Sequence, residues 1–176
     1  MADIQTGAGY GTNLPVDASL FVRDTGGGYL AASPEQILQA ARKVIDLRLS
    51  RGDSLTSPSL ATDYLQAKLA GYDHEVFGAI FLDTQHRMIE YNELFHGTLD
   101  SASVYPREVV KVVLHHNAGA VIFTHNHPSG VPDPSEADKR ITQRLMEVLD
   151  LIDVRVLDHI IVAGNDTLSF AEHGLI

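Results

Sequence analysis

Apolar positions along the chain predict two helices in the N-terminal part and alternating strands and helices in the C-terminal part. In residues 33–51, a Ser-Pro-Glu-Gln start precedes apolar residues at helical spacing. Residues 57–71 show a second helical pattern that ends at a glycine. Residues 1–32 are rich in Gly, Thr and Asn. We expect these first residues to be mostly irregular, with one short strand near 19–23.

From residue 74 onward the pattern is typical of an α/β domain. Residues 76–82 are apolar at nearly every position, as in a strand covered on both faces, and residues 86–91 are its predicted hairpin partner. The other predicted elements are helix 106–117, strand 118–124, a helix that begins at Ser135, and strands 154–162 and 167–171. Their order predicts a three-layer α-β-α sandwich around a mixed β-sheet. We therefore predict an N-terminal extension, 1–73, and an α/β domain, 74–176.

Composition narrows the class of protein. With 176 residues, 44% of them hydrophobic and 20% charged, the chain has the make-up of an ordinary globular protein. The absence of a long apolar run and of a signal-peptide pattern predicts a cytoplasmic protein without a membrane partner. Because there is no cysteine, any metal must be held by nitrogen and oxygen. The net charge of −10 and the scattered lysines and arginines do not support a nucleic-acid partner.

The segment 124–138 carries the candidate chemistry. His125 and His127 are two residues apart after the predicted strand, so an extended backbone would direct both imidazoles to one side. Asp138 follows at the start of the next predicted helix. Imidazoles and a carboxylate are ligands that zinc prefers, and three protein ligands leave a fourth position for water. The sequence thus predicts a catalytic site for one Zn²⁺.

Asp138 also has a purely structural interpretation. Ser-x-x-Asp before an apolar run is a capping box, in which Ser135 and Asp138 would only begin a helix. A serine that accepts through its oxygen can still donate its hydrogen to a developing oxyanion. A carboxylate that binds a metal, in contrast, is expected to close a capping box poorly. For Asp138 the two interpretations compete, and the residues alone leave both open.

Hydrolysis also requires a general base to accept a proton from water. The chain offers five candidate glutamates: Glu75, Glu90, Glu93, Glu108 and Glu136. Glu75 directly precedes the apolar strand and would lie at the edge of the sheet, whereas Glu108 is equally explained as a first-turn residue of a helix. Spacing alone does not select among the five.

Five residues outside this motif need a separate interpretation. His115 and His116 end a predicted helix, where the helix dipole favours cations, so they are expected to be capping and solvated. Asp158 and His159 lie in a predicted strand and are interpreted as structural or close to the site. His74, beside Glu75, could approach the site.

Taken together, the motifs resemble the JAMM metalloprotease motif, also called JAB or MPN-plus: a distant Glu, His-x-His, seven residues, Ser, two residues and Asp. The sequence His-Asn-His-Pro-Ser-Gly at 125–130 is more narrowly similar to the RadC family of bacterial proteins. Segments 81–85, 94–110 and 154–162 agree with that family, and the resemblance covers about residues 74–176. It implies a JAB/MPN-like fold with the layering of cytidine deaminases.

The resemblance also implies roles for individual residues. Glu75 takes the position of the family's catalytic glutamate, and Ser135 the position that stabilises the oxyanion. His125, His127 and Asp138 take the positions of the zinc ligands. The implied reaction is hydrolysis of an amide or isopeptide bond in a protein or peptide substrate by a metal-activated water.

Two alternatives remain beside a zinc peptidase. The DNA-repair label of the family invites a metal-dependent nuclease or a repair accessory protein, which the charge does not support. A non-catalytic module with purely structural zinc would be expected to have a fourth protein ligand. Longer RadC relatives carry an N-terminal helix-hairpin-helix associated with DNA, whereas residues 1–73 show no such pattern, so the chain resembles the short form. The oligomeric state stays open, and a homodimer is one alternative.

Overall fold

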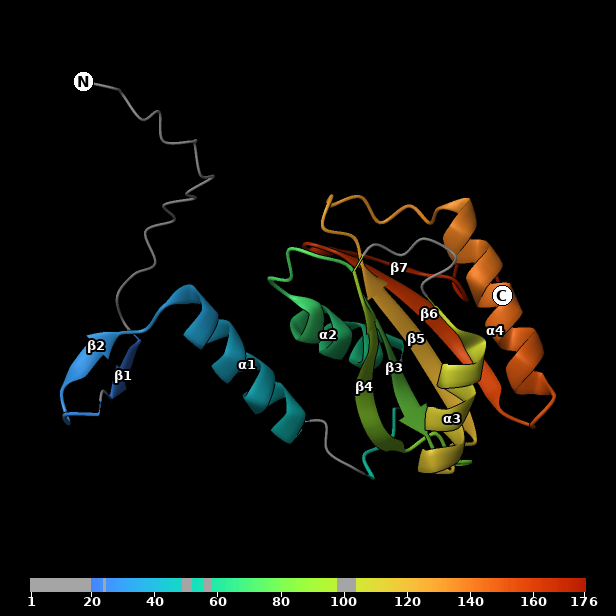
Figure 1. Cartoon of the computed structure of the whole chain (residues 1–176), viewed down its shortest axis with the longest axis horizontal. Helices are drawn as coiled ribbons and strands as arrows, with labels where there is room; N and C mark the ends of the chain where they lie inside the picture. Colours follow the sequence, from blue (N-terminus) through green and yellow to red (C-terminus); the bar gives the residue numbers. More distant parts are fainter. Residues whose placement is uncertain (1–19, 24, 49–51, 56–57, 98–103) are drawn as a thin grey trace, which may run out of the picture. The chain divides into compact units, whose positions relative to one another are not determined.

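The computed structural model describes residues 20–23, 25–48, 52–55, 58–97 and 104–176 (Figure 1). The chain divides into two compact units, Met1–Gln39 and Ala40–Ile176. In the first unit, β1 (Phe21–Arg23) and β2 (Tyr29–Ala31) pair antiparallel. The strand predicted near residues 19–23 is therefore found as β1, whereas β2 is an addition. Most of the predicted irregular segment falls outside the described residues.

Two helices follow where the sequence predicts them. α1 (Pro34–Arg48) begins with a reciprocal cap, because the Gln36 amide donates to Ser33 Oγ at 3.3 Å and the Ser33 amide donates to Gln36 Oε1 at 2.9 Å. α2 (Pro58–Leu69) is followed by Gly71, whose φ of 76° lies in the left-handed region that glycine adopts readily. None of the helices in the described ranges is long and apolar enough to span a bilayer.

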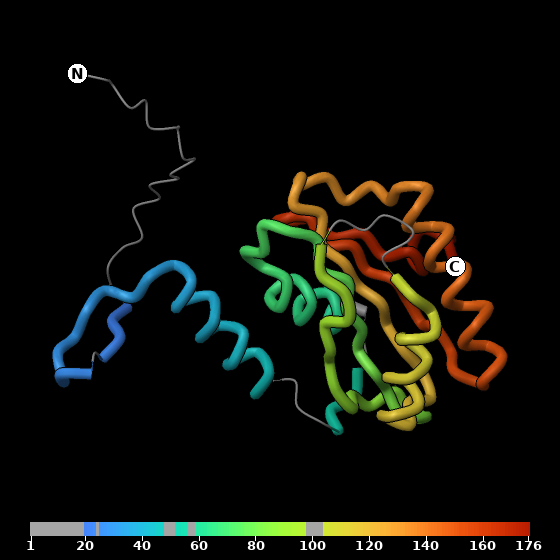
Figure 2. Tube along the Cα trace, in the orientation of Figure 1, coloured from blue at the N-terminus to red at the C-terminus, as the bar shows by residue number. Residues whose placement is uncertain are grey.

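The second unit is built on a five-stranded sheet with the order β4-β3-β5-β6-β7. The strands are β3 (Val76–Leu82), β4 (Met88–His96), β5 (Ala120–Asn126), β6 (Arg155–Ala163) and β7 (Asp166–Ser169). β5 and β6 are parallel and the other pairs antiparallel, which makes the sheet mixed as predicted. Figure 2 traces the β3–β4 hairpin and the crossover from β5 through α4 (Glu136–Asp150) to β6.

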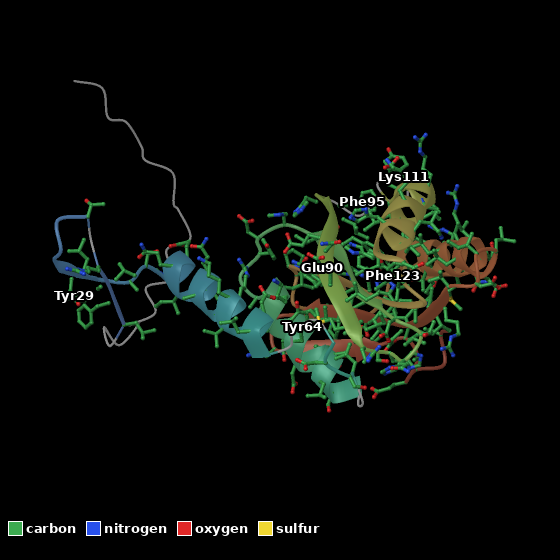
Figure 3. All side chains as sticks on the ribbon, turned by 90° about the horizontal axis from the view of Figure 1, so that it is seen from below. Tyr29, Tyr64, Glu90, Phe95, Lys111 and Phe123 are labelled. Atoms are coloured by element: carbon green, nitrogen blue, oxygen red, sulfur yellow. The ribbon has the colours of Figure 1, made fainter. Side chains whose placement is uncertain are left out.

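Helices cover both faces of this sheet. α3 (Pro106–His116) and α4 lie on one face and α2 on the other (Figure 1). Alternate residues of β3 supply the two cores: Phe77 and Phe81 face α3 and α4, whereas Ile80 and Leu82 face α2. In Figure 3, Phe123 marks the first core and Tyr64 the second. The predicted α-β-α sandwich is confirmed.

Two strands run further than the sequence pattern indicates. β4 continues past the predicted 86–91 to His96, which pairs with Val76 at the start of β3. Its polar residues do not end the strand because distant groups bind them: His116 Nε2 lies 2.8 Å from Asn92 Oδ1, and Tyr72 donates to Glu93 Oε1 at 2.9 Å. β5 likewise runs beyond the predicted 118–124 and takes in His125 and Asn126.

Candidate metal centre

Three predicted ligands meet where β5 ends and α4 begins. His125 lies in β5 and is fully buried, His127 follows the strand and is partly buried, and Asp138 lies in the first turn of α4. Their ligand atoms all lie within 4.8 Å of one another. The two Nε2 atoms are 2.9 Å apart, and His125 Nε2 is 3.4 Å from Asp138 Oδ1. The sequence spacing therefore brings together a group able to hold a metal ion.

Asn126, between the two histidines, points away from this group and joins β5 to β3. Its Oδ1 accepts from the Val76 amide at 2.7 Å, and its Nδ2 donates to the His74 carbonyl at 2.9 Å. These two backbone groups stand on either side of Glu75. One side chain of the His-x-His segment thus fixes the backbone of the candidate base.

Glu75 lies beside the histidine group, and its charge contributes to raising the pKa of His127. The other four candidate bases, all within the described ranges, have partners elsewhere. Glu90 lies 3.9 Å from His116, and Glu93 accepts from Tyr72. The remaining two are bound by lysines of their own helices, Glu108 by Lys111 and Glu136 by Lys139. Of the five candidates, Glu75 is thus the one whose charge acts on a residue of the histidine group.

The carboxylate of Asp138 caps the helix and faces the histidines at the same time. Its Oδ2 accepts from the Ser135 amide at 2.8 Å and from Ser135 Oγ at 2.6 Å, while Ser135 Oγ accepts from the Asp138 amide at 3.1 Å. Its Oδ1 is directed at His125. The capping box predicted by the sequence is therefore present, and it leaves Oδ1 on the side of His125, while the capping oxygen Oδ2 lies 3.7 Å from His127 Nε2. The expected competition between capping and metal binding stays a prediction.

The charges in this group suit a cation. Burial lowers the pKa of His125 to about 4, so its imidazole is neutral near pH 7. The nearby Asp138 carboxylate, whose Oδ2 lies 3.7 Å from His127 Nε2, raises the pKa of His127. Burial alone would raise the pKa of Asp138, but His127, His125 and Ser135 together hold it well below its usual range. An ionised carboxylate therefore faces two imidazoles in a largely buried site.

A hydrogen bond at His127 also favours binding of a cation. His127 Nδ1 lies 2.7 Å from the Val131 carbonyl, which can only accept, so Nδ1 carries the hydrogen. In the neutral ring, Nε2 then holds a lone pair directed at the group. Nitrogen lone pairs and a carboxylate oxygen form the donor set that zinc and similar divalent ions prefer.

Comparison with known proteins assigns the chain to a protein family. Residues 55–175 match the sequence profile of the RadC-like JAB domain. The chain belongs to the RadC-like JAB domain family. The match includes α2, whose residues Leu65 and Leu69 are buried in the core on that face of the sheet.

Relatives of this RadC-like JAB domain occur in several bacteria. A UPF0758 protein of Vibrio cholerae is 55% identical over 143 residues, which is 81% of this chain and 90% of that protein. UPF0758 proteins of Aeromonas hydrophila and Nitrosococcus oceani are 54% and 57% identical over 81% and 79% of this chain. The chain spans 64% and 62% of the length of those two proteins.

Other histidines of the RadC-like domain lie outside the ligand group. His159 is buried behind His125, with its Nε2 2.8 Å from His125 Nδ1, which agrees with a position close to the site.

His74 is exposed and its Nδ1 lies 2.9 Å from Asp73 Oδ1. His115 is exposed, as expected. The prediction of a solvated His116 is wrong, because its ring stacks on Phe81 at 4.8 Å and is mostly buried.

Asp158 and Thr142 complete the surroundings of His159. Asp158 is structural: it accepts from the amides of His159 and Ala171 at 2.7 and 3.0 Å and from Ser169 Oγ at 2.6 Å. Thr142 Oγ1 lies 2.6 Å from His159 Nδ1. Sequence reasoning missed Thr142, although its position four residues after Asp138 places it on the same side of α4.

A cavity of about 270 Å³ borders the ligand group on the side of α2. Its lining comes from the residues after α2, the end of β5 and the β6–β7 turn, and includes Tyr72, His127, Pro128, Gly130 and Asn165. The cavity thus lies next to His127, one of the three residues of the ligand group.

Proposed function

We propose that this domain is a hydrolase that holds one Zn²⁺ with His125, His127 and Asp138 and cleaves peptide or isopeptide bonds. The observation that carries the proposal is the meeting of two imidazoles and one ionised carboxylate within 4.8 Å. When bound, Zn²⁺ supplies an open coordination position, polarises a carbonyl oxygen and lowers the pKa of water toward about 7.

Glu75 is the proposed general base. Its carboxylate accepts a proton from the attacking water and then donates it to the amine that leaves. Asn126 supports this role because it fixes the backbone on both sides of Glu75. The charge of Glu75 acts on His127, which agrees with a position beside the ligands.

Ser135 is the proposed oxyanion donor. Its hydroxyl hydrogen is directed at Asp138 Oδ2 at 2.6 Å. We infer that this hydrogen turns to the substrate carbonyl oxygen as negative charge develops there. Ser135 Oγ continues to accept from the Asp138 amide during this rotation, so the helix cap is retained.

The ligand count supports a catalytic rather than a purely structural zinc. Within the described ranges the group contains three ligands, whereas structural zinc sites are almost always closed by four protein ligands. His159 contacts the far nitrogen of His125 rather than the group itself. The neighbouring cavity of about 270 Å³ offers space for one substrate side chain next to the scissile bond.

The decisive experiment compares the wild type with Glu75→Gln, which keeps the shape of the side chain and removes its basicity. Zinc content is measured for both proteins, and hydrolysis is followed in parallel on a fluorogenic peptide library and on DNA. We expect Glu75→Gln to retain zinc and lose peptide hydrolysis. Glu90→Gln, an exposed position on β4, is the matched control and should behave as the wild type (Figure 3).

Three other outcomes would change the conclusion. DNA cleavage that disappears in Glu75→Gln would assign the site to phosphodiesters. Peptide hydrolysis that persists in Glu75→Gln would remove this residue from the mechanism. A wild-type protein that binds no zinc at micromolar concentration would contradict the proposed metal site itself.

A further inference from the structure

Behind His125 lies a buried chain of hydrogen bonds that joins three elements. His125 Nδ1 on β5 is 2.8 Å from His159 Nε2 on β6, and His159 Nδ1 is 2.6 Å from Thr142 Oγ1 on α4. Thr142 Oγ1 in turn donates to the backbone carbonyl of Asp138 at 2.6 Å. All three side chains are at most 1% exposed, so solvent does not compete for these bonds.

The Asp138 carbonyl, at the end of this chain of hydrogen bonds, determines which atom of each pair donates. The Asp138 carbonyl can only accept, so the single hydroxyl hydrogen of Thr142 is used there. Thr142 Oγ1 can then only accept from His159, which places a hydrogen on His159 Nδ1. A neutral His159 is left with a lone pair on Nε2, and this lone pair accepts the hydrogen of His125 Nδ1.

The same reasoning fixes the nitrogen that faces the metal position. Both rings are fully buried, and the hydrogen-bond partners of His159 are Thr142 and His125, neither of which is a carboxylate, so the neutral form of His159 is favoured. A neutral His125 with its hydrogen on Nδ1 carries a lone pair on Nε2. That atom lies 2.9 Å from His127 Nε2 and 3.4 Å from Asp138 Oδ1.

An imidazole is an unusual partner for a ligand histidine. Such ligands mostly donate to a carboxylate, a backbone carbonyl or water, groups that accept in every state available to them. An imidazole accepts at Nε2 in only one of its two neutral tautomers. His159 therefore needs a second group to select that tautomer, and Thr142 is in contact with the nitrogen that decides it.

Packing holds the His159 ring in place. The rings of Phe77, Phe123 and Phe170 lie 5.6, 6.2 and 4.8 Å from it, centroid to centroid. These apolar neighbours enclose the ring without a hydrogen bond, which leaves the choice of tautomer to Thr142 and His125.

We propose that His159 and Thr142 are positioning residues that set the tautomer of His125, so that its Nε2 is unprotonated and directed at the metal before an ion arrives. This proposal rests on the metal site proposed above and extends it by two residues. Asp138 then serves the site twice, through its carboxylate toward the metal and through its backbone carbonyl toward Thr142.

The first test measures the Zn²⁺ affinity of the full-length chain by competition with a chromophoric chelator. Thr142→Val keeps the shape of the side chain and removes the hydroxyl. We expect the affinity for Zn²⁺ to fall about 10- to 100-fold, as it does when other groups that hydrogen-bond to metal ligands are replaced. Thr142→Ser restores the hydroxyl and should bind within a few-fold of the wild type. An unchanged affinity in Thr142→Val would overturn the proposal.

The same titration distinguishes hydrogen bonding from packing at His159. His159→Gln offers an amide oxygen to His125 Nδ1 and should bind Zn²⁺ more tightly than His159→Phe, which offers no acceptor. Phe170→Leu is the control, because it alters the packing around His159 and no side-chain hydrogen bond. It should lower thermal stability and leave Zn²⁺ affinity unchanged. Equal losses in all three variants would indicate a merely structural role.

The second test observes the tautomers directly. Long-range ¹H–¹⁵N correlation spectra of histidine-labelled, metal-free protein should show His125 and His159 both protonated at Nδ1. Thr142→Val should convert His159 to a mixture or to the Nε2-protonated form. A wild-type His159 protonated at Nε2 would overturn the proposal. These spectra require no bound ion, so they decide the proposal even if Zn²⁺ binding, and with it the proposed function, fails.

Discussion

Ser135 and Asp138 bind each other through only one of the two carboxylate oxygens. Both the amide and the hydroxyl of Ser135 donate to Oδ2, at 2.8 and 2.6 Å, and Oδ1 remains directed at His125. The cap therefore holds the first turn of α4 in a geometry in which Oδ1 faces the ligand group. Helix capping and the position of the proposed ligand oxygen thus depend on the same pair of residues.

Replacement of Ser135 by alanine should produce two separate losses. Removing the cap should lower the free energy of unfolding by about 1 kcal/mol, measured by urea denaturation of the metal-free protein. Removing the proposed oxyanion donor should slow peptide hydrolysis about 100- to 1,000-fold with zinc content unchanged. Ser135→Thr can cap and donate and should retain most of both properties. Full activity in Ser135→Ala would show that the assigned role is wrong.

Asn126→Asp should reduce turnover without removing the metal. An ionised aspartate keeps the acceptor for the Val76 amide but places an oxygen against the His74 carbonyl, so the backbone around Glu75 should shift. A displacement of about 1 Å can slow an enzyme about 100-fold. The measurement is kcat together with zinc content. Asn92→Asp, which keeps the acceptor beside His116, is the control and should leave kcat unchanged.

Tyr91→Phe should stabilise the protein. Tyr91 Oη is buried and has no hydrogen-bond partner among the described residues. Removing an unsatisfied buried hydroxyl should raise the free energy of unfolding by about 1–3 kcal/mol, measured in urea. Tyr64 packs edge-on against Tyr91 but donates to Asp46 Oδ1 at 3.1 Å, so Tyr64→Phe should instead lower stability by about 0.5–1.5 kcal/mol. Equal effects of the two substitutions would contradict this reasoning.

Zinc should raise the melting temperature of the metal-free protein. An ion that binds only the folded state at 100 times its Kd adds about 2.7 kcal/mol, which for a chain of this size is a shift of about 5–10 °C in differential scanning fluorimetry. A chelator should reverse the shift. In His127→Ala, zinc should shift the melting temperature only slightly. A full shift in that variant would show that the ion binds elsewhere.

The sequence predicts most strands and helices because the periodicity of apolar residues is a local signal. The grouping of His125, His127 and Asp138 is also predictable, since the end of a strand and the start of a helix carry their own local patterns. The full length of β4 is not predictable, because Asn92 and Glu93 are satisfied by groups distant in sequence.

The hydrogen-bond partners of His159 escape sequence reasoning for the same reason. His159 and Thr142 meet only when β6 and α4 have packed, so neither has a local signature. Glu75 could be chosen only by resemblance, because its place beside the ligands depends on Asn126 across the sheet. The dual use of Asp138 depends on the orientation of two oxygens, which no spacing encodes.

The crossover from β5 through α4 to β6 is one continuous stretch of sequence. It contains the three proposed ligands and the two proposed positioning residues, Thr142 and His159. Glu75 directly precedes β3, which pairs with β5 on the side opposite β6. The proposed ligands and the proposed general base therefore lie in separate parts of the sequence, whereas the proposed oxyanion donor, Ser135, lies with the ligands. On the proposed assignment, a change at position 75 alone would remove the base and leave every proposed ligand in place.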